Sequence, residues 1–167
     1  MDIRSETEND WSAVYDLNVL AFDTKAEANL VNSLRKCATP YISLVAKIED
    51  EVVGHIMFTP VELTEYSSVF IMGLAPMAVK ENFRGVGVGS KLVASGIEAC
   101  EKLGVGAIVV LGHANYYPRF GFKPASNFYL SCEYDVPDEV FMALELMPGY
   151  LSSKSGVVKY HETFASV

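Results

Sequence analysis

The sequence predicts an α/β fold in which helices flank a mixed central sheet. An apolar segment, Val69–Val79, leads into a glycine-dense turn, Arg84–Gly89, and then into a run with helical spacing, Ser90–Leu103. Gly104 is placed to end that helix, and the apolar run Val105–Leu111 follows it. A strand, a helix and a second strand in this order form a right-handed parallel unit. The continuous apolar character of the second strand predicts that it is covered on both faces.

Two helices are predicted in the first forty residues, after a short strand at Asp2–Arg4. Apolar residues recur with helical spacing over Trp11–Phe22, with Asn9 or Asp10 as the N-cap, and again over Ala26–Cys37. The apolar face that we expect for the first helix consists of Trp11, Val14, Leu17 and Ala21.

An antiparallel hairpin is predicted next. The β-branched and apolar segments Tyr41–Ile48 and Val52–Val61 flank the acidic turn Glu49–Glu51. We interpret His55, in the second of these segments, as a strand residue rather than a catalytic one. Three further extended segments are expected near the C-terminus, at Ser126–Tyr134, Glu139–Leu146 and Val157–Tyr160.

Size and composition predict one domain spanning residues 1–167. The net charge of −8 argues against nucleic-acid binding, because most of the surface would repel a phosphate backbone. The same charge is compatible with a cationic substrate. No apolar run approaches the roughly 20 residues that cross a bilayer, and the acidic N-terminus is no secretory signal, so we expect a cytoplasmic protein without membrane contact. The three cysteines lack metal-site spacing, and no metal is expected.

The turn Arg84–Gly89 has the composition of a phosphate-binding loop. The first turn of a helix leaves backbone N–H groups without partners and carries a partial positive charge, and a phosphate group satisfies both. Glycines at alternate positions, Gly85, Gly87 and Gly89, allow unusual dihedrals and a close approach of the backbone to an anion. The sequence therefore predicts a ligand that carries phosphate.

Two common phosphate motifs do not match the turn. A Walker loop requires a lysine followed by serine or threonine, whereas Lys91 follows Ser90 and precedes Leu92. A dinucleotide fingerprint requires a third glycine where Ser90 stands and an acidic residue about twenty positions later, where the chain has the apolar run Ala107–Leu111. Both mismatches disfavour a nucleotide-binding α/β protein.

Three segments together resemble the Gcn5-related N-acetyltransferase (GNAT) superfamily. They are the pattern Arg-x-x-Gly-x-Gly at Arg84–Gly89, the preceding segment Leu74–Val79 and the later Tyr-x-x-x-Gly-Phe at Tyr117–Phe122. The C-terminal segments resemble an uncharacterised bacterial branch of predicted N-acetyltransferases. The resemblance implies a mostly antiparallel sheet of about six to seven strands with a splay between strands 4 and 5. Pro76 agrees with an irregularity in strand 4, because proline lacks the N–H group that a sheet ladder needs.

The resemblance also implies that acetyl-coenzyme A is the donor. The amides after the splay would hold the pantetheine arm and polarise the thioester, and the loop would hold the pyrophosphate. The candidate coenzyme-binding residues are Met77, Ala78, Val79, Arg84, Gly85, Val86, Gly87, Val88, Gly89, Ser90 and Asn115.

Tyr117 stands, by resemblance, where a tyrosine protonates the departing coenzyme A thiolate. A phenol is protonated at neutral pH and is a suitable donor to a thiolate. Tyr116 is the alternative if the turn is displaced by one residue. The general base stays open, because Phe70–Val79 contains no acidic residue. The candidates are Glu62, Glu65, His55 and His113, and His113 has a suitable unperturbed pKa. A substrate with a lower pKa would need no dedicated base.

The activity that these residues predict is direct acetyl transfer from acetyl-coenzyme A to an amine in a ternary complex, since holding both reactants together removes much of the entropic barrier. The alternative is a non-catalytic sensor or regulatory module that binds acyl-coenzyme A. The acceptor is not determined by these residues, although the acidic charge favours a cation. A homodimer through the final strands is left open.

Overall fold

The computed structural model describes residues 1–167, which form two compact units. Strands β3 (Glu51–Leu63) and β4 (Tyr66–Val79) pass from one unit into the other along their length and are hydrogen-bonded neighbours. Unit 1 comprises residues 1–59, 75–99 and 162–167, and unit 2 comprises residues 60–74 and 100–161.

The sheet of unit 1 begins with β1 (Asp2–Ser5), which is antiparallel to β2 (Ile42–Ile48). Strand β2 is in turn antiparallel to β3, with a register shift between Ala46 and Lys47. Glu49 and Asp50 make the turn, both with positive φ. The predicted hairpin is therefore confirmed, with β3 longer than expected.

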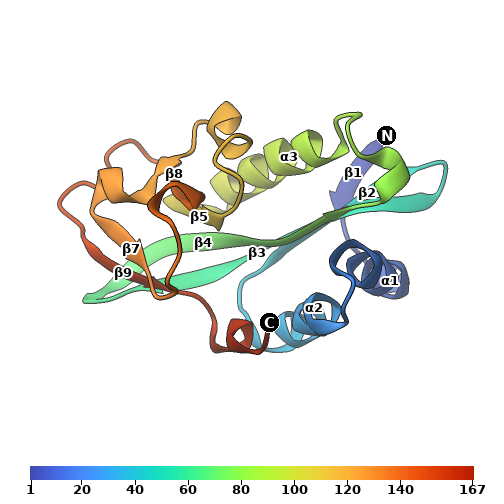
Figure 1. The fold of residues 1–167 in the computed structure, drawn as a ribbon, viewed down its shortest axis with the longest axis horizontal. Helices are drawn as coiled ribbons and strands as arrows, with labels where there is room; N and C mark the ends of the chain where they lie inside the picture. The colour runs from blue at the N-terminus through green and yellow to red at the C-terminus, as the bar shows by residue number, and fades with distance from the viewer. The chain divides into compact units, whose positions relative to one another are not determined.

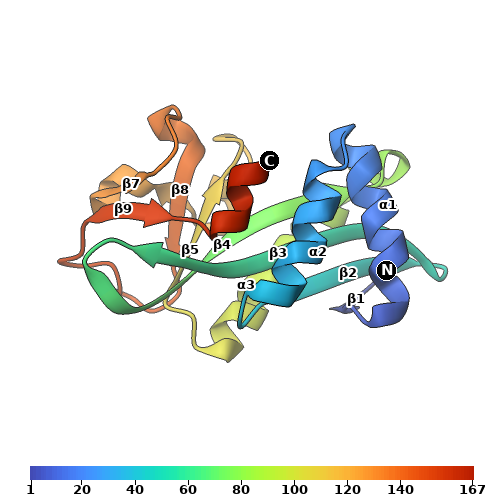
Figure 2. The ribbon, with the colours of Figure 1, turned by 90° about the horizontal axis from the view of Figure 1, so that it is seen from below.

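Helices α1 (Trp11–Phe22) and α2 (Ala26–Cys37) have the predicted bounds. They lie side by side across β2 and β3 (Figure 2). Trp11 was expected on the buried face of α1, and this was wrong. Its side chain is 39% exposed and lies under the Arg35 guanidinium, 4.9 Å from the ring centroid. Asp10 precedes α1 as expected, but its carboxylate binds Arg4 and the Thr7 amide rather than capping the helix.

Helix α3 (Val88–Leu103) covers the opposite face of β3 (Figure 1). It begins two residues before the predicted start. At its other end Gly104 has φ +90° and donates its N–H to the Glu101 carbonyl, as expected for a glycine that ends a helix.

The sheet of unit 2 is mixed. Strand β4 is parallel to β5 (Ala107–Leu111), and β5 is antiparallel to β8 (Phe141–Glu145). The two-residue strand β6 (Lys123–Pro124) pairs with β8. Strand β9 (Gly156–Lys159) pairs antiparallel with β3 and parallel with β7 (Leu130–Cys132).

These pairings give nine strands in a mixed, mostly antiparallel sheet, which confirms the predicted fold class. The late segments are shorter than expected. Residues 126–134 keep only β7 as a strand, because a 3₁₀ helix, Ala125–Phe128, occupies the start of the range. Another 3₁₀ helix, Asp138–Val140, replaces the first residues of the predicted strand at 139–146.

The parallel pairing of β4 with β5 is brief. It joins Ile71–Gly73 to Ala107–Val109, whereas Val110 and Leu111 pair only with β8. This is where the expected splay between the fourth and fifth strands begins. Strand β4 is continuous through Pro76, which follows a cis peptide bond. None of the helices combines the length and the hydropathy that a membrane crossing requires.

Candidate active site

The loop between β4 and α3 exposes its backbone. Gly85 has φ +79° and Gly87 has φ +92°, a region that residues with a side chain rarely adopt. A Cβ atom at either position would have no heavy atom within 4 Å. The two glycines are therefore required by the backbone conformation, and open space lies beside both of them.

The loop is anchored at both of its ends. The Lys91 amide donates to the Gly87 carbonyl at 3.1 Å, which ties the first turn of α3 to the loop. Val88, the first residue of α3, is 1% exposed, whereas Val86 within the loop is 67% exposed. The Arg84 Nε donates to the Val79 carbonyl at 3.0 Å, which holds this side chain at the end of β4. A fixed backbone with an exposed surface at a helix N-terminus is suited to binding an anion.

Unit 1 also contains a cavity of about 480 Å³ beside this loop. Apolar side chains of α1, among them Leu17 and Leu20, form one wall. The end of β4 and the residues that follow it, from Val79 to Arg84, form the other wall. Asp23 and Glu81 also line this cavity, so the carboxylates and the cations around it are mixed.

The residues proposed to hold the pantetheine arm lie at the end of β4. Ala78 is 3% exposed, while Met77 and Val79 are half-buried. This alternation follows from the period of two along a strand. The Lys80 amide donates to the Val53 carbonyl at 2.8 Å and so fixes the end of β4 against β3.

Tyr117 is buried in unit 2, where it begins a 3₁₀ helix, Tyr117–Phe120. Its ring makes edge contacts with Tyr116 and Phe122, at centroid distances of 5.1 Å and 5.6 Å. Burial raises the pKa of Tyr117 to about 12, with a smaller contribution from Tyr116. The phenol is therefore protonated across the physiological range.

Gly112, which the sequence analysis did not single out, leaves the room that the Tyr117 ring occupies. It follows β5 directly, and a methyl group at this position would overlap the Tyr117 ring. The signal available in the sequence was a glycine that ends a buried strand five residues before an aromatic side chain.

The neighbours of Tyr117 have different environments. Tyr116 is half-buried, with the Arg119 guanidinium 4.5 Å above its ring. His113 and Asn115 are exposed in the turn after β5, where the Tyr116 amide donates to the His113 carbonyl. Unit 2 therefore brings His113, Asn115, Tyr116 and Tyr117 into one short turn.

The other candidate bases lie elsewhere. Glu62 and Glu65 line a cavity of about 600 Å³ at the hairpin between β3 and β4, together with Lys159. His55 is fully buried in β3, which confirms its interpretation as a strand residue.

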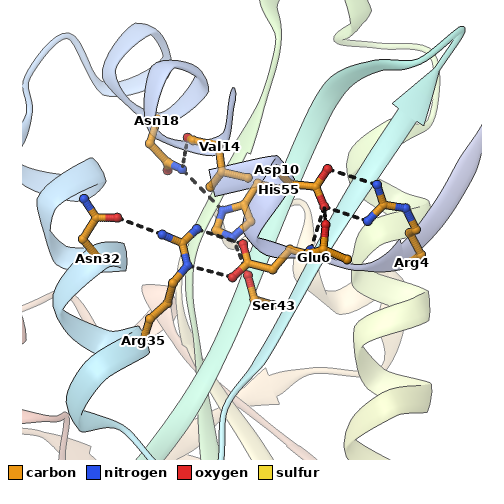
Figure 3. A network of polar contacts seen from close by, with 10 residues as sticks. Arg4, Glu6, Asp10, Val14, Asn18, Asn32, Arg35, Ser43 and His55 are labelled. Carbon is orange, nitrogen blue, oxygen red and sulfur yellow. Dashed lines mark hydrogen bonds and ion pairs between the residues drawn. The ribbon is translucent and has the colours of Figure 1, made fainter. Parts of the chain in front are cut away.

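His55 belongs to a polar network between the sheet of unit 1 and its two N-terminal helices (Figure 3). The Nε2 atom lies 2.8 Å from the Ser43 Oγ, and Nδ1 lies 3.4 Å from the Asn18 Nδ2. Because the Asn18 amide is a donor, Nδ1 is the acceptor and Nε2 carries the hydrogen. Burial lowers the pKa of His55 to about 4, opposed by the charge of Glu6 and reinforced by that of Arg35. The imidazole is thus neutral at pH 7.

Two ion pairs complete the network. Arg35 and Glu6 form a bidentate pair at 2.7 Å and 2.8 Å, and both side chains are 5% exposed. Arg4 binds Asp10 at 2.7 Å and 3.0 Å, and this hydrogen bonding lowers the pKa of Asp10 to about 2. No group of three or more His, Cys, Asp or Glu side chains is arranged to hold a metal ion.

Comparisons with known proteins agree with this architecture. The family described as the acetyltransferase (GNAT) family matches residues 10–122. The uncharacterized N-acetyltransferase YhbS of Escherichia coli K12 is 34% identical over 165 residues, which cover 98% of both chains. A second E. coli K12 relative, the uncharacterized N-acetyltransferase YjhQ, is 40% identical over 136 residues, or 79% of this chain and 75% of the relative.

Two solved structures extend the agreement to three dimensions. The crystal structure of E. coli YhbS in complex with CoA has a TM-score of 0.92 and covers 98% of this chain and 91% of its own. A GNAT family acetyltransferase from Brucella melitensis in complex with acetyl-CoA has a TM-score of 0.81 at 30% identity, with 98% of this chain and 97% of that chain covered. The chain with the glycine loop between β4 and α3 therefore belongs to the acetyltransferase (GNAT) family.

Proposed function

We propose that this acetyl-CoA-dependent N-acetyltransferase transfers the acetyl group directly to an amine in a ternary complex. The observation that carries the proposal is the loop with two left-handed glycines, open on its outer side, at the N-terminus of α3. We propose further that both units form one acetyltransferase domain. The family match supports this, because residues 10–122 include parts of each unit.

The donor is held, in this proposal, by backbone rather than by side chains. The amides of residues 84–90 would bind the pyrophosphate of the coenzyme, aided by the partial positive charge at the N-terminus of α3. The open space beside Gly85 and Gly87 is the room that a phosphate group needs. Arg84, held at the end of β4 through its bond to Val79, would add a fixed positive charge.

The end of β4 would orient the reactive part of the donor. Amides at Met77–Val79 would donate to the pantetheine arm and to the thioester carbonyl, and so stabilise the charge that develops on its oxygen. The brief pairing of β4 with β5, which ends at Gly73, supports this role because strand residues beyond the pairing retain hydrogen-bonding capacity.

Tyr117 would act as the general acid. The amine nitrogen attacks the carbonyl carbon, the carbon–sulfur bond breaks, and the sulfur takes the proton of the Tyr117 phenol. The amine releases a proton, which restores the phenol through solvent or through His113, an exposed side chain on the same turn. With a pKa of about 12, the Tyr117 phenol is protonated before transfer, although the same shift makes it a weaker proton donor to the thiolate than an exposed phenol.

Replacing Tyr117 by phenylalanine separates this proposal from the sensor alternative. We expect Tyr117→Phe to lower kcat by a factor of about 10² to 10⁴, the usual contribution of a general acid, with unchanged affinity for coenzyme A. Release of the coenzyme thiol would be measured over a panel of polyamines, amino acids and lysine peptides. Tyr116→Phe is the matched control and should keep its turnover.

The results have distinct meanings. Equal turnover in Tyr117→Phe and the parent would contradict the acid assignment. Coenzyme binding without turnover on any amine of the panel would favour the sensor.

We also propose a cytoplasmic location, which the three free thiols support because such thiols persist in a reducing compartment. A homodimer stays a prediction, to be tested by light scattering.

A further inference from the structure

Helix α3 is seated on β3 by an exchange of large and small residues between the two elements. Val88 and Leu92 are one helical turn apart on the face of α3 that meets β3, and Gly54 lies beneath both. A Cβ atom on Gly54 would lie 2.8 Å from the Leu92 Cδ1 and 2.9 Å from the Val88 Cγ1. Ala46, the neighbour of Gly54 on β2, is also small, so the sheet has a depression at this point.

The arrangement is reversed one turn further along α3. Here the helix contributes the glycine, Gly96, and the sheet contributes the large side chain, Phe58. A methyl group on Gly96 would overlap the Phe58 ring. Gly54 and Phe58 are on the same face of β3 because they are four residues apart on a strand. Large groups on each element thus enter gaps on the other.

Because of this exchange, α3 can pack at only one position along β3. A slide of the helix along the strand would bring Val88 against Ile56 or Gly96 away from Phe58, and both Ile56 and Phe58 are fully buried. The non-helical part of the phosphate-binding loop ends at Gly87, directly before Val88, the first residue of α3. We propose that Gly54 and Gly96 are positioning residues that set the place of the coenzyme loop through α3. This inference rests on the proposed function of that loop.

The two glycines should differ in their effect on the coenzyme. Backbone donors must be held within about 0.5 Å of their productive positions. A methyl group at Gly54 displaces Val88, in the first turn of α3, whereas Gly96 lies eight residues further on, or about 12 Å along the helix. Gly54→Ala should therefore disturb the loop more than Gly96→Ala does.

The test is calorimetric titration of the full chain with coenzyme A. We expect Gly54→Ala to raise Kd about tenfold or more, because small displacements in a binding site have effects of this size. Val31→Ala, which shortens a buried side chain of α2, is the control, with the loss in Tm recorded for each variant. If Gly54 affects only the stability of the fold, Gly54→Ala and Val31→Ala should show the same rise in Kd for the same loss in Tm. An equal rise of Kd at an equal loss in Tm would therefore overturn the proposal.

A rescue experiment covers the case in which Gly54→Ala does not fold. Gly96→Ala should weaken coenzyme binding, and adding Phe58→Leu should restore it, because the shorter side chain lacks the ring atoms that the new methyl group overlaps. Failure of Phe58→Leu to restore binding would overturn the inference. If the parent protein does not bind coenzyme A, the proposed function falls as well; if it binds and both glycine variants bind equally well, only the positioning role falls.

Discussion

In the proposed mechanism, the glycine loop between β4 and α3 and the turn around Tyr117 would contribute in opposite ways. The loop offers backbone, at glycines with positive φ and no neighbouring atoms, and its side chain Val86 is largely exposed. The turn offers one side chain, Tyr117, which is 6% exposed and packed among aromatic rings. A site made of backbone is encoded by glycine spacing, whereas a buried side chain depends on residues that carry no motif. Substitutions in the loop should therefore weaken coenzyme binding, whereas substitutions around Tyr117 should lower turnover.

The largest effect that we expect is a loss of folding stability in acid, which arises from His55 of unit 1. His55 of unit 1 is neutral when folded, with a pKa of about 4 against 6.5 for an exposed imidazole. The contribution of His55 to stability is then fully present above pH 6.5 and is lost as pH falls from 6.5 towards 4, by about 3 kcal/mol in all. Urea unfolding across this range checks the slope. His55→Gln should flatten it, and the exposed His113→Gln should not; a parent profile without a slope would refute the assignment.

Unit 2 should respond to alkali instead. The Tyr117 phenol has a pKa of about 12 when folded and about 10 when exposed. Because the pKa is raised on folding, the contribution of Tyr117 to stability is fully present below pH 10 and is lost as pH rises from 10 towards 12, by about 3 kcal/mol. Tyr117→Phe should remove that component of the alkaline loss, as measured by urea unfolding at pH 9 and 11. A parallel loss in parent and variant would count against burial of the phenol.

Gly112→Ala changes the packing around Tyr117 and leaves the residues of the loop unaltered. The added methyl group overlaps the Tyr117 ring and displaces the phenol, so turnover should fall about a hundredfold while the Kd for coenzyme A stays unchanged. Steady-state kinetics and calorimetry check the two quantities. A comparable loss of coenzyme affinity would mean that the two regions are not separable.

Gly85→Ala is the converse change and has the smallest expected effect. It strains a backbone at φ +79° but meets no neighbouring atom. We expect about 1 kcal/mol of strain, seen as a Kd for coenzyme A about fivefold higher, with saturated turnover near that of the parent. A fall in saturated turnover with unchanged Kd would contradict the division of roles.

The sequence predicted the parts of this molecule that local chemistry specifies. The open conformation at Gly85 and Gly87, the helix bounds of α1 and α2, and the Gly104 terminus follow from φ preferences and apolar spacing, which act within a few residues. The expectation for Gly89 was wrong, because this residue lies within α3 and has no positive φ. Trp11 was misplaced because spacing alone does not reveal that Arg35 lies over its ring.

The remaining features depend on contacts between distant segments. The packing of Tyr117 on Gly112, the seating of α3 on Gly54, and the His55 network all join residues that no periodicity relates. The predicted extents of the late strands β7 and β8 were too long, because β propensity does not show where a strand loses its partner.

The most direct test of the central claim is calorimetric titration of acetyl-coenzyme A, coenzyme A and ATP into the parent and into Gly87→Glu. Gly104→Glu is the matched control, because Gly104 also has a positive φ and open space beside it but lies at the other end of α3. We predict saturable binding of both coenzymes by the parent and the control, weak binding of ATP, and loss of coenzyme binding in Gly87→Glu. Coenzyme binding that survives in a folded Gly87→Glu protein would contradict the assignment of the loop.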